Sequence, residues 1–143
     1  MKGKLRYTVL SLLSFTLFLF LFFSSPSICL SAKSVIGIWG GIVQQPGSKP
    51  YSVIMKIESL TEGETSGNIK YPELKCGGSI TYFGTENNAH IFFEKMEFGR
   101  NRCSDGGEIR VKITKDGNMT WIWYYPNGKR GAYTLLKPIK DNN

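Results

Sequence analysis

The chain has 143 residues, enough for one domain, and its 18 Lys and Arg against 11 Asp and Glu give a formal net charge of +7. Three of the basic residues lie within residues 1–32, so the charge of the remainder is 15 − 11 = +4. Charges of both signs alternate along that remainder, which leaves no basic stripe of the kind that binds nucleic acid, and we expect no nucleic-acid partner.

The N-terminal segment has the three parts of a secretory signal. Basic residues precede an apolar run from Val9 to Phe23, and small residues with one proline follow as far as Ala32. The run is shorter than the roughly 20 apolar residues of a spanning helix. We therefore predict that residues 1–32 are a signal peptide and that a single exported domain, residues 33–143, begins near Lys33. The compartment is then the medium, the periplasm or the cell envelope.

Two other interpretations of this segment stay open. The first is a membrane anchor that is not cleaved from the domain. The second is a lipoprotein modified at Cys29, although a lipidation motif needs a small residue before the cysteine and Ile28 stands there.

The cysteine count predicts one disulfide. Cys29 would leave with the signal, and the domain would keep Cys76 and Cys103. An even number of cysteines in a small exported domain indicates that they are bonded. Closing the loop between them should stabilise the fold by about 3–4 kcal/mol in the chain-entropy model.

The rest of the chain consists of short β-rich runs bounded by Gly, Asn, Asp or Pro, without a sustained helical period. The predicted strands are Ile36–Val43, Tyr51–Glu58, Gly67–Tyr71, Gly78–Phe83, His90–Phe98, Glu108–Thr114, Met119–Tyr125 and Arg130–Lys137, and Thr61–Ser66 and Gly84–Asn88 are among the predicted turns. We therefore predict an all-β antiparallel meander that closes into an eight-stranded up-and-down barrel, with a β-sandwich as the alternative. Such a barrel is filled by side chains or holds one small ligand.

The run Met119–Tyr125 has two faces, because strand side chains alternate. Size and apolarity favour Trp121 and Trp123 on the inside. Tyr124 then lies at the surface beside Lys129 and Arg130, and these three residues are the predicted contact patch for an acidic partner.

The first predicted strand carries a short motif, Gly37-Ile38-Trp39, followed by two glycines. It resembles the Gly-x-Trp signature with which lipocalin and related calycin barrels begin. The resemblance implies that Trp39 closes one end of the barrel and packs against a basic residue near the last strand, for which Arg130 and Lys137 are the candidates. The chain differs from lipocalins in its shorter length and in the absence of a predicted C-terminal helix.

A longer pattern is similar to a group of small exported bacterial domains without an assigned activity. It comprises Ile36–Gly41, Gly67–Gly78, Cys103 with the following Gly106-Gly107, Trp123 and Gly128. The similarity implies export and the disulfide, and it assigns no functional residue.

The sequence contains no recognisable set of catalytic residues. His90 is the only histidine, and no nucleophile motif lies beside it. Glu94 and Glu97 fall on opposite faces of a strand, so we interpret both as solvating charges rather than as a catalytic pair. One histidine and a disulfide provide too few ligands for a metal, and we expect neither a metal nor a cofactor.

Two classes of function remain. The first is a non-catalytic binding or interaction domain, whose partner is a small apolar ligand, an acidic protein or an anionic envelope polymer. The second is a small envelope-associated protein inhibitor. The aromatic residues clustered late in the chain cannot all enter one core, which favours an aromatic binding face over an enzyme. A net charge of +4 suits acidic partners better than it suits a lysozyme inhibitor, which needs an acidic face.

Overall fold

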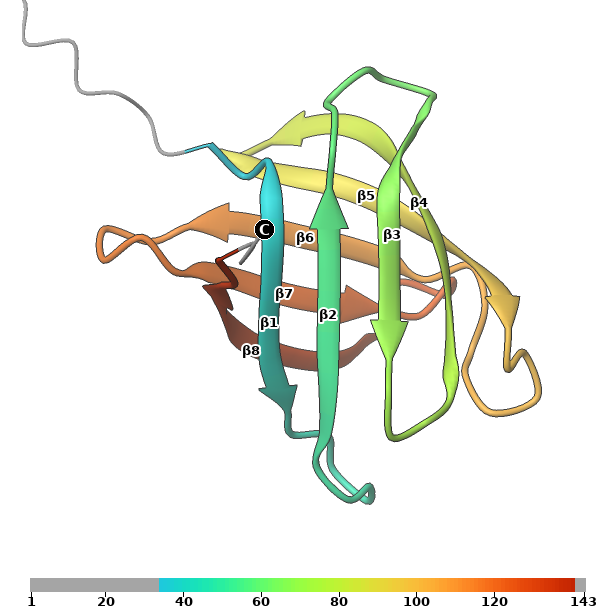
Figure 1. Cartoon of the computed structure of the whole chain (residues 1–143). Helices are drawn as coiled ribbons and strands as arrows, with labels where there is room; N and C mark the ends of the chain where they lie inside the picture. The colour runs from blue at the N-terminus through green and yellow to red at the C-terminus, as the bar shows by residue number, and fades with distance from the viewer. Residues whose placement is uncertain (1–33, 141–143) are drawn as a thin grey trace, which may run out of the picture. The chain divides into compact units, whose positions relative to one another are not determined.

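A computed structural model describes residues 34–140, which form a closed barrel of antiparallel strands (Figure 1). The strands are β1 (Gly37–Val43), β2 (Tyr51–Ile57), β3 (Thr65–Tyr71), β4 (Cys76–Glu86), β5 (Ala89–Phe98), β6 (Glu108–Ile113), β7 (Met119–Tyr124) and β8 (Arg130–Pro138). Each strand pairs with the next, and β8 returns to β1. The prediction of an eight-stranded up-and-down barrel is therefore confirmed.

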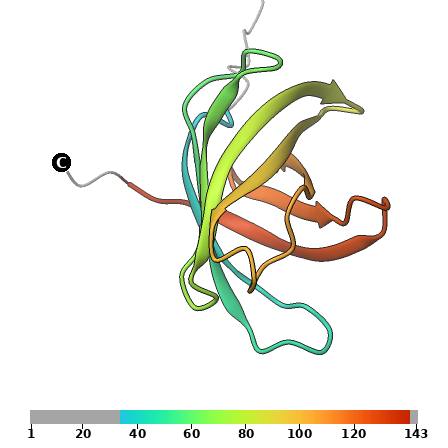
Figure 2. The same ribbon diagram turned by 90° about the vertical axis from the view of Figure 1, so that its right-hand side faces the viewer.

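Alternating side chains explain why these segments form strands with one face inside the barrel. In β2 the odd-numbered positions from Tyr51 to Ile57 are buried and the residues between them are half-buried. Strand β7 repeats the pattern, and its inward residues include Trp121 and Trp123, as predicted. Figure 1 shows β1, β2 and β3 side by side, and Figure 2 shows the long β4 curving over one side of the barrel with β5 next to it.

The turn predicted at Gly84–Asn88 is shorter in the structure. Strand β4 continues to Glu86, and only Asn87 and Asn88 connect it to β5, with φ angles of 50° and 62°. Asparagine adopts this left-handed conformation more readily than most residues. Gly84, with a φ of 134°, marks a shift in the β4–β5 register rather than a turn. The predicted turn Thr61–Ser66 is also shortened, because β3 already begins at Thr65.

Trp39 is buried near the start of β1, at one end of the barrel. Its side chain is 5% exposed, and its indole N–H donates to the carbonyl oxygen of Val35 at 2.7 Å. Of the two basic residues expected beside it, Lys137 is exposed and pairs with Gly40, whereas the Arg130 guanidinium lies over the ring of Tyr133. Trp39 is buried as predicted, but the guanidinium of Arg130 packs on Tyr133 and not on Trp39.

The topology places four connections at the end opposite to Trp39. In an antiparallel meander the β1–β2, β3–β4, β5–β6 and β7–β8 connections lie at the same end of the barrel. The predicted signal peptide and Cys29 lie outside the described residues. Within residues 34–140 no helix has the length and apolarity needed to cross a membrane.

Candidate functional site

A cavity of about 210 Å³ lies at the end where these four connections meet. Five aromatic side chains line it, namely Tyr51, Tyr71, Trp121, Trp123 and Tyr125. The volume of this cavity is below the range of about 300–1,000 Å³ that is typical of ligand pockets, so the cavity suits one small molecule.

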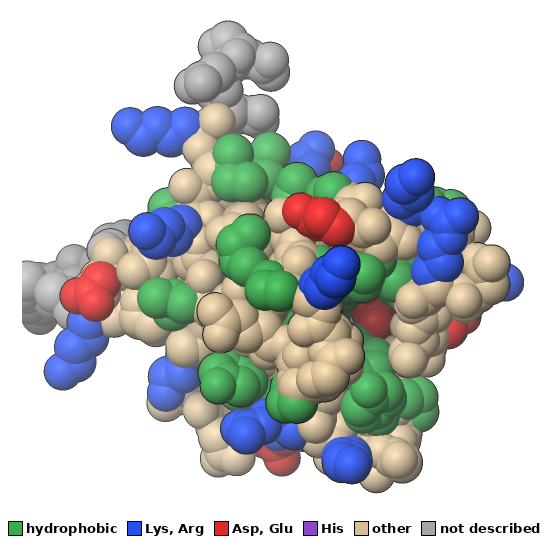
Figure 3. All heavy atoms as spheres, turned by 90° about the horizontal axis from the view of Figure 1, so that it is seen from below, with side chains coloured by type: hydrophobic (Ala, Val, Ile, Leu, Met, Phe, Trp, Pro, Cys, Tyr) green, Lys and Arg blue, Asp and Glu red, His purple; other side chains and the backbone are tan. Residues whose placement is uncertain are grey.

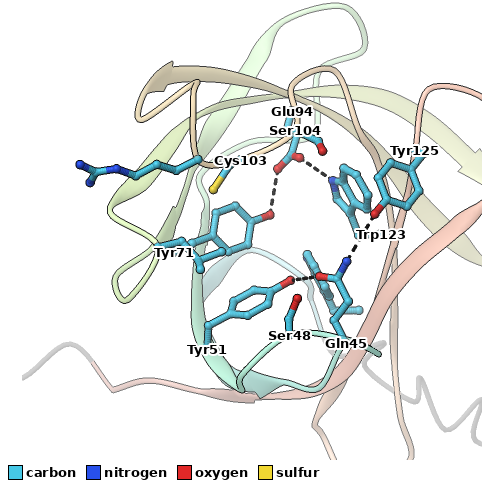
Figure 4. Close-up of a pocket in the computed structure, with 12 residues that line it drawn as sticks. Gln45, Ser48, Tyr51, Tyr71, Glu94, Cys103, Ser104, Trp123 and Tyr125 are labelled. Carbon is cyan, nitrogen blue, oxygen red and sulfur yellow. Dashed lines mark hydrogen bonds between the residues drawn. The ribbon is translucent and has the colours of Figure 1, made fainter.

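Glu94 on β5 is the buried acidic group of this cavity. Its side chain is 3% exposed, and its carboxylate accepts hydrogen bonds from the Tyr71 hydroxyl at 2.9 Å and from the Trp123 indole N–H (Figure 4). None of the ion pairs formed within residues 34–140 involves this carboxylate. A carboxylate buried without a counter-charge is costly unless hydrogen bonds or a ligand compensate it.

The surroundings of Glu94 change its acidity. Burial raises the pKa of Glu94 to about 7, although the hydrogen bonds from Tyr71 and Trp123 oppose this rise. The carboxylate of Asp105 adds a further, smaller increase in the pKa. At neutral pH the Glu94 carboxyl is therefore present in both its neutral and its ionised form, and it can accept or release a proton.

A second hydrogen-bonded group lies across the cavity. The Tyr51 hydroxyl donates to Gln45 Oε1 at 3.0 Å, and Gln45 Nε2 donates to the Tyr125 hydroxyl at 3.4 Å. Figure 4 shows this group facing Glu94, with Ser48 and Ser104 also at the cavity. Burial and the charge of Glu94 raise the pKa of Tyr51 to about 12, so its hydroxyl keeps its proton at neutral pH.

Two glycines position the Trp123 indole that contacts Glu94. A Cβ atom at Gly107 would lie 2.0 Å from Trp123 Nε1, and one at Gly131 would lie 2.5 Å from the six-membered part of the ring. Only glycine leaves room for the indole at these distances. Gly131 lies at a register shift between β7 and β8, and its backbone lies against the Trp123 ring there.

The disulfide Cys76–Cys103 holds one wall of the cavity, and its presence confirms the predicted pairing. Cys103 and its neighbours Arg102 and Ser104 lie on the β5–β6 connection and line the cavity. The same connection is fastened by Asp105, whose carboxylate accepts a hydrogen bond from the Met96 amide at 2.7 Å. The covalent bond therefore fixes a segment of the cavity wall as well as the fold.

The predicted contact patch lies outside this cavity. Tyr124 is on the outer face of β7, half-buried, with the Arg110 guanidinium 5.5 Å from its ring centroid. Lys129 and Arg130 are exposed, and Arg130 pairs with Tyr124 across the strands. Figure 3 views the barrel from the end where β1 and β3 finish, and basic side chains are dispersed there among hydrophobic ones. Binding of an acidic partner by Tyr124, Lys129 and Arg130 stays a prediction.

The interpretation of Glu94 as a solvating charge is wrong, whereas Glu97 is exposed as expected. The signal that could have identified Glu94 is its place between Phe92 and Met96, both of which are fully buried and share its strand face. A carboxyl at an inward position of a barrel strand lies either in a cavity or against a buried partner.

His90 lies away from this cavity, beside the β4–β5 turn at the opposite end of the barrel. Its Nδ1 is 3.2 Å from the Tyr82 hydroxyl, and burial lowers the pKa of the imidazole. Among the described residues, no group of three or more His, Cys, Asp or Glu side chains is arranged to hold a metal ion.

No protein-family model, curated protein or solved structure matches this chain.

Proposed function

We propose that this protein is an exported, calycin-like barrel that binds one small ligand in the Glu94 cavity and does not transform it. The single observation that carries this proposal is the Glu94 carboxyl in the wall of a solvent-connected cavity, where it is 3% exposed and has no counter-charge among residues 34–140. A filled core would place an apolar side chain at this inward position. Buried ionisable groups with altered acidity concentrate at functional sites.

The composition of the cavity favours binding of a partly polar ligand. Aromatic rings form the walls, and the polar groups of Glu94 and Gln45 converge from opposite sides. Ligand pockets commonly combine apolar walls with a few polar groups that orient the ligand. A purely apolar ligand would leave these groups without new partners, so the small apolar ligand considered from the sequence fits this cavity less well.

The chemistry of the lining supports binding rather than catalysis. Glu94 is the one carboxyl among the described residues that line the cavity. Hydrolysis of a glycosidic bond uses two carboxyl groups roughly 5–10 Å apart, and Ser or Cys nucleophiles are commonly activated by a histidine. His90 lies at the other end of the barrel.

Export is supported by the signal-like segment and is compatible with the disulfide. Residues 1–32 have the order of parts found in secretory signals. The bond Cys76–Cys103 would persist in an oxidising compartment.

Thermal denaturation in the presence of a panel of small anions, cations, zwitterions and neutral polyols tests the binding function. A ligand of the cavity raises the midpoint of unfolding, because it binds the folded state alone. Glu94→Gln should abolish the rise, and the matched control Glu97→Gln, an exposed carboxyl on the same strand, should keep it. A compound that stabilises the wild type and Glu94→Gln equally, or a panel without any stabilising compound, would contradict the proposal.

A further inference from the structure

The rings that line the cavity form two groups of aromatic contacts. Tyr71 makes edge-to-face contacts with Tyr51 and with Trp121, at centroid distances of 6.0 and 6.5 Å. Trp123 and Tyr125 form a second edge-to-face pair at 4.5 Å. In an edge-to-face pair the two ring planes are steeply inclined to each other, so the faces of these five rings point in several directions. Ring faces attract organic cations that lie within about 6 Å of their centroids.

Glu94 adds a negative charge at this wall, and no cation within residues 34–140 forms an ion pair with it. Its two hydrogen bonds come from Tyr71 and Trp123, which are members of the aromatic set. Both donors are uncharged, so the charge of ionised Glu94 stays uncompensated within the described residues. A ligand with an ammonium group gains from the carboxylate and from the rings at once, which an anion or a neutral group does not.

One basic residue lines the cavity. Arg102 is the one Lys or Arg among the described lining residues, and it is exposed on the β5–β6 connection. A ligand that has a carboxylate beside its ammonium group offers this guanidinium a partner, because a guanidinium binds a carboxylate through two parallel hydrogen bonds.

We propose that the ligand is a small zwitterion of the betaine or amino-acid class, with its ammonium group against Glu94 and the aromatic rings and its carboxylate toward Arg102. This inference depends on the proposed binding function and specifies the ligand of the same cavity.

Calorimetric titration of the purified protein with three probes of similar shape tests the assignment. Glycine betaine has a trimethylammonium group and a carboxylate, choline has the ammonium group with a hydroxyl, and tert-butylacetate has the carboxylate with an uncharged tert-butyl group. We expect glycine betaine to bind most tightly and each of the other two to bind about tenfold more weakly, because each lacks one charge-assisted contact.

Two substitutions separate the two ends of the ligand. Glu94→Gln should weaken glycine betaine and choline by about tenfold or more, whereas the control Glu97→Gln should leave both unchanged. Arg102→Gln should weaken glycine betaine to the level of choline without weakening choline itself, and Lys95→Gln, at an exposed position of β5 outside the lining, is its control. Because Arg102 is exposed, its substitution tests the assignment even if Glu94→Gln does not fold.

The outcomes distinguish this inference from the proposed function. If tert-butylacetate binds as tightly as glycine betaine, or if Arg102→Gln leaves glycine betaine binding unchanged, the zwitterion assignment is wrong. If none of the three probes binds while a neutral polyol or another anion does, the assignment is wrong and the binding function stands. If no compound of any charge class binds, both are wrong.

Discussion

Replacing Glu94 by glutamine removes a titrating group from the barrel interior while keeping the size and polarity of its side chain. The pKa of Glu94 is raised from 4.5 to about 7 by burial, so the folded protein holds a proton that the unfolded chain has already released. The stability contributed by this proton is fully present below about pH 4.5 and is lost as the pH rises to about 7.

The magnitude of this loss follows from the shift of the pKa. Each unit corresponds to about 1.4 kcal/mol, so a shift from 4.5 to about 7 gives a loss of about 3 kcal/mol. Urea unfolding of the wild type and of Glu94→Gln at about pH 5 and about pH 8 measures it as a difference between the two proteins. His90 and the other titrating groups are present in both proteins, so their contributions cancel in this difference.

The expected result is a wild type whose free energy of unfolding falls by about 3 kcal/mol more than that of Glu94→Gln over this range. Glu97→Gln, which changes an exposed carboxyl on the same strand, should follow the wild type. Parallel pH profiles of the wild type and Glu94→Gln would refute the reasoning, because the buried carboxyl would then not be the group that titrates.

Three further predictions concern the packing around the site. Gly107→Ala should destabilise the fold by about 1–3 kcal/mol in urea unfolding, since its Cβ would displace the Trp123 indole, and an unchanged stability would contradict the contact. Trp39→Ala should cost about 3–5 kcal/mol in the same assay, whereas a loss below about 1 kcal/mol would show that this tryptophan is not buried in the core. Reducing the disulfide Cys76–Cys103 should lower the free energy of unfolding by about 3–4 kcal/mol and weaken ligand binding, and a reduced protein of equal stability and affinity would contradict its role in the cavity wall.

The fold could be predicted from local features of the sequence. Alternation of apolar and polar residues identifies a strand, and a pair such as Asp116-Gly117 identifies a turn, from neighbouring positions alone. Short connections between successive strands then predict an antiparallel meander that can close into a barrel. The boundaries of β4 and β5 were harder to predict, because Gly84 can mark a turn or a bulge. The register in which β4 pairs with β5 shows that Gly84 marks a bulge, and local sequence does not contain this register.

The cavity could not be predicted in the same way, because its contacts join residues far apart in the chain. Glu94 meets Tyr71 and Trp123, which are 23 and 29 residues away along the sequence. An isolated charge within a strand usually faces solvent, and that expectation outweighed the inward register set by Phe92 and Met96. Gln45 likewise lies in a connection, and its role depends on the four connections meeting at one end.

The central claim, that the Glu94 cavity is the ligand site, is tested most directly by the indole N–H signals of the protein in nuclear magnetic resonance spectra. The three tryptophans divide between the two ends of the barrel, with Trp121 and Trp123 lining the cavity and Trp39 buried near the opposite end. Titration with glycine betaine, or with whichever compound of the panel stabilises the protein, should shift the signals of Trp121 and Trp123 in a saturable manner and leave that of Trp39 in place. Shifts confined to Trp39, or equal shifts of all three, would contradict the account.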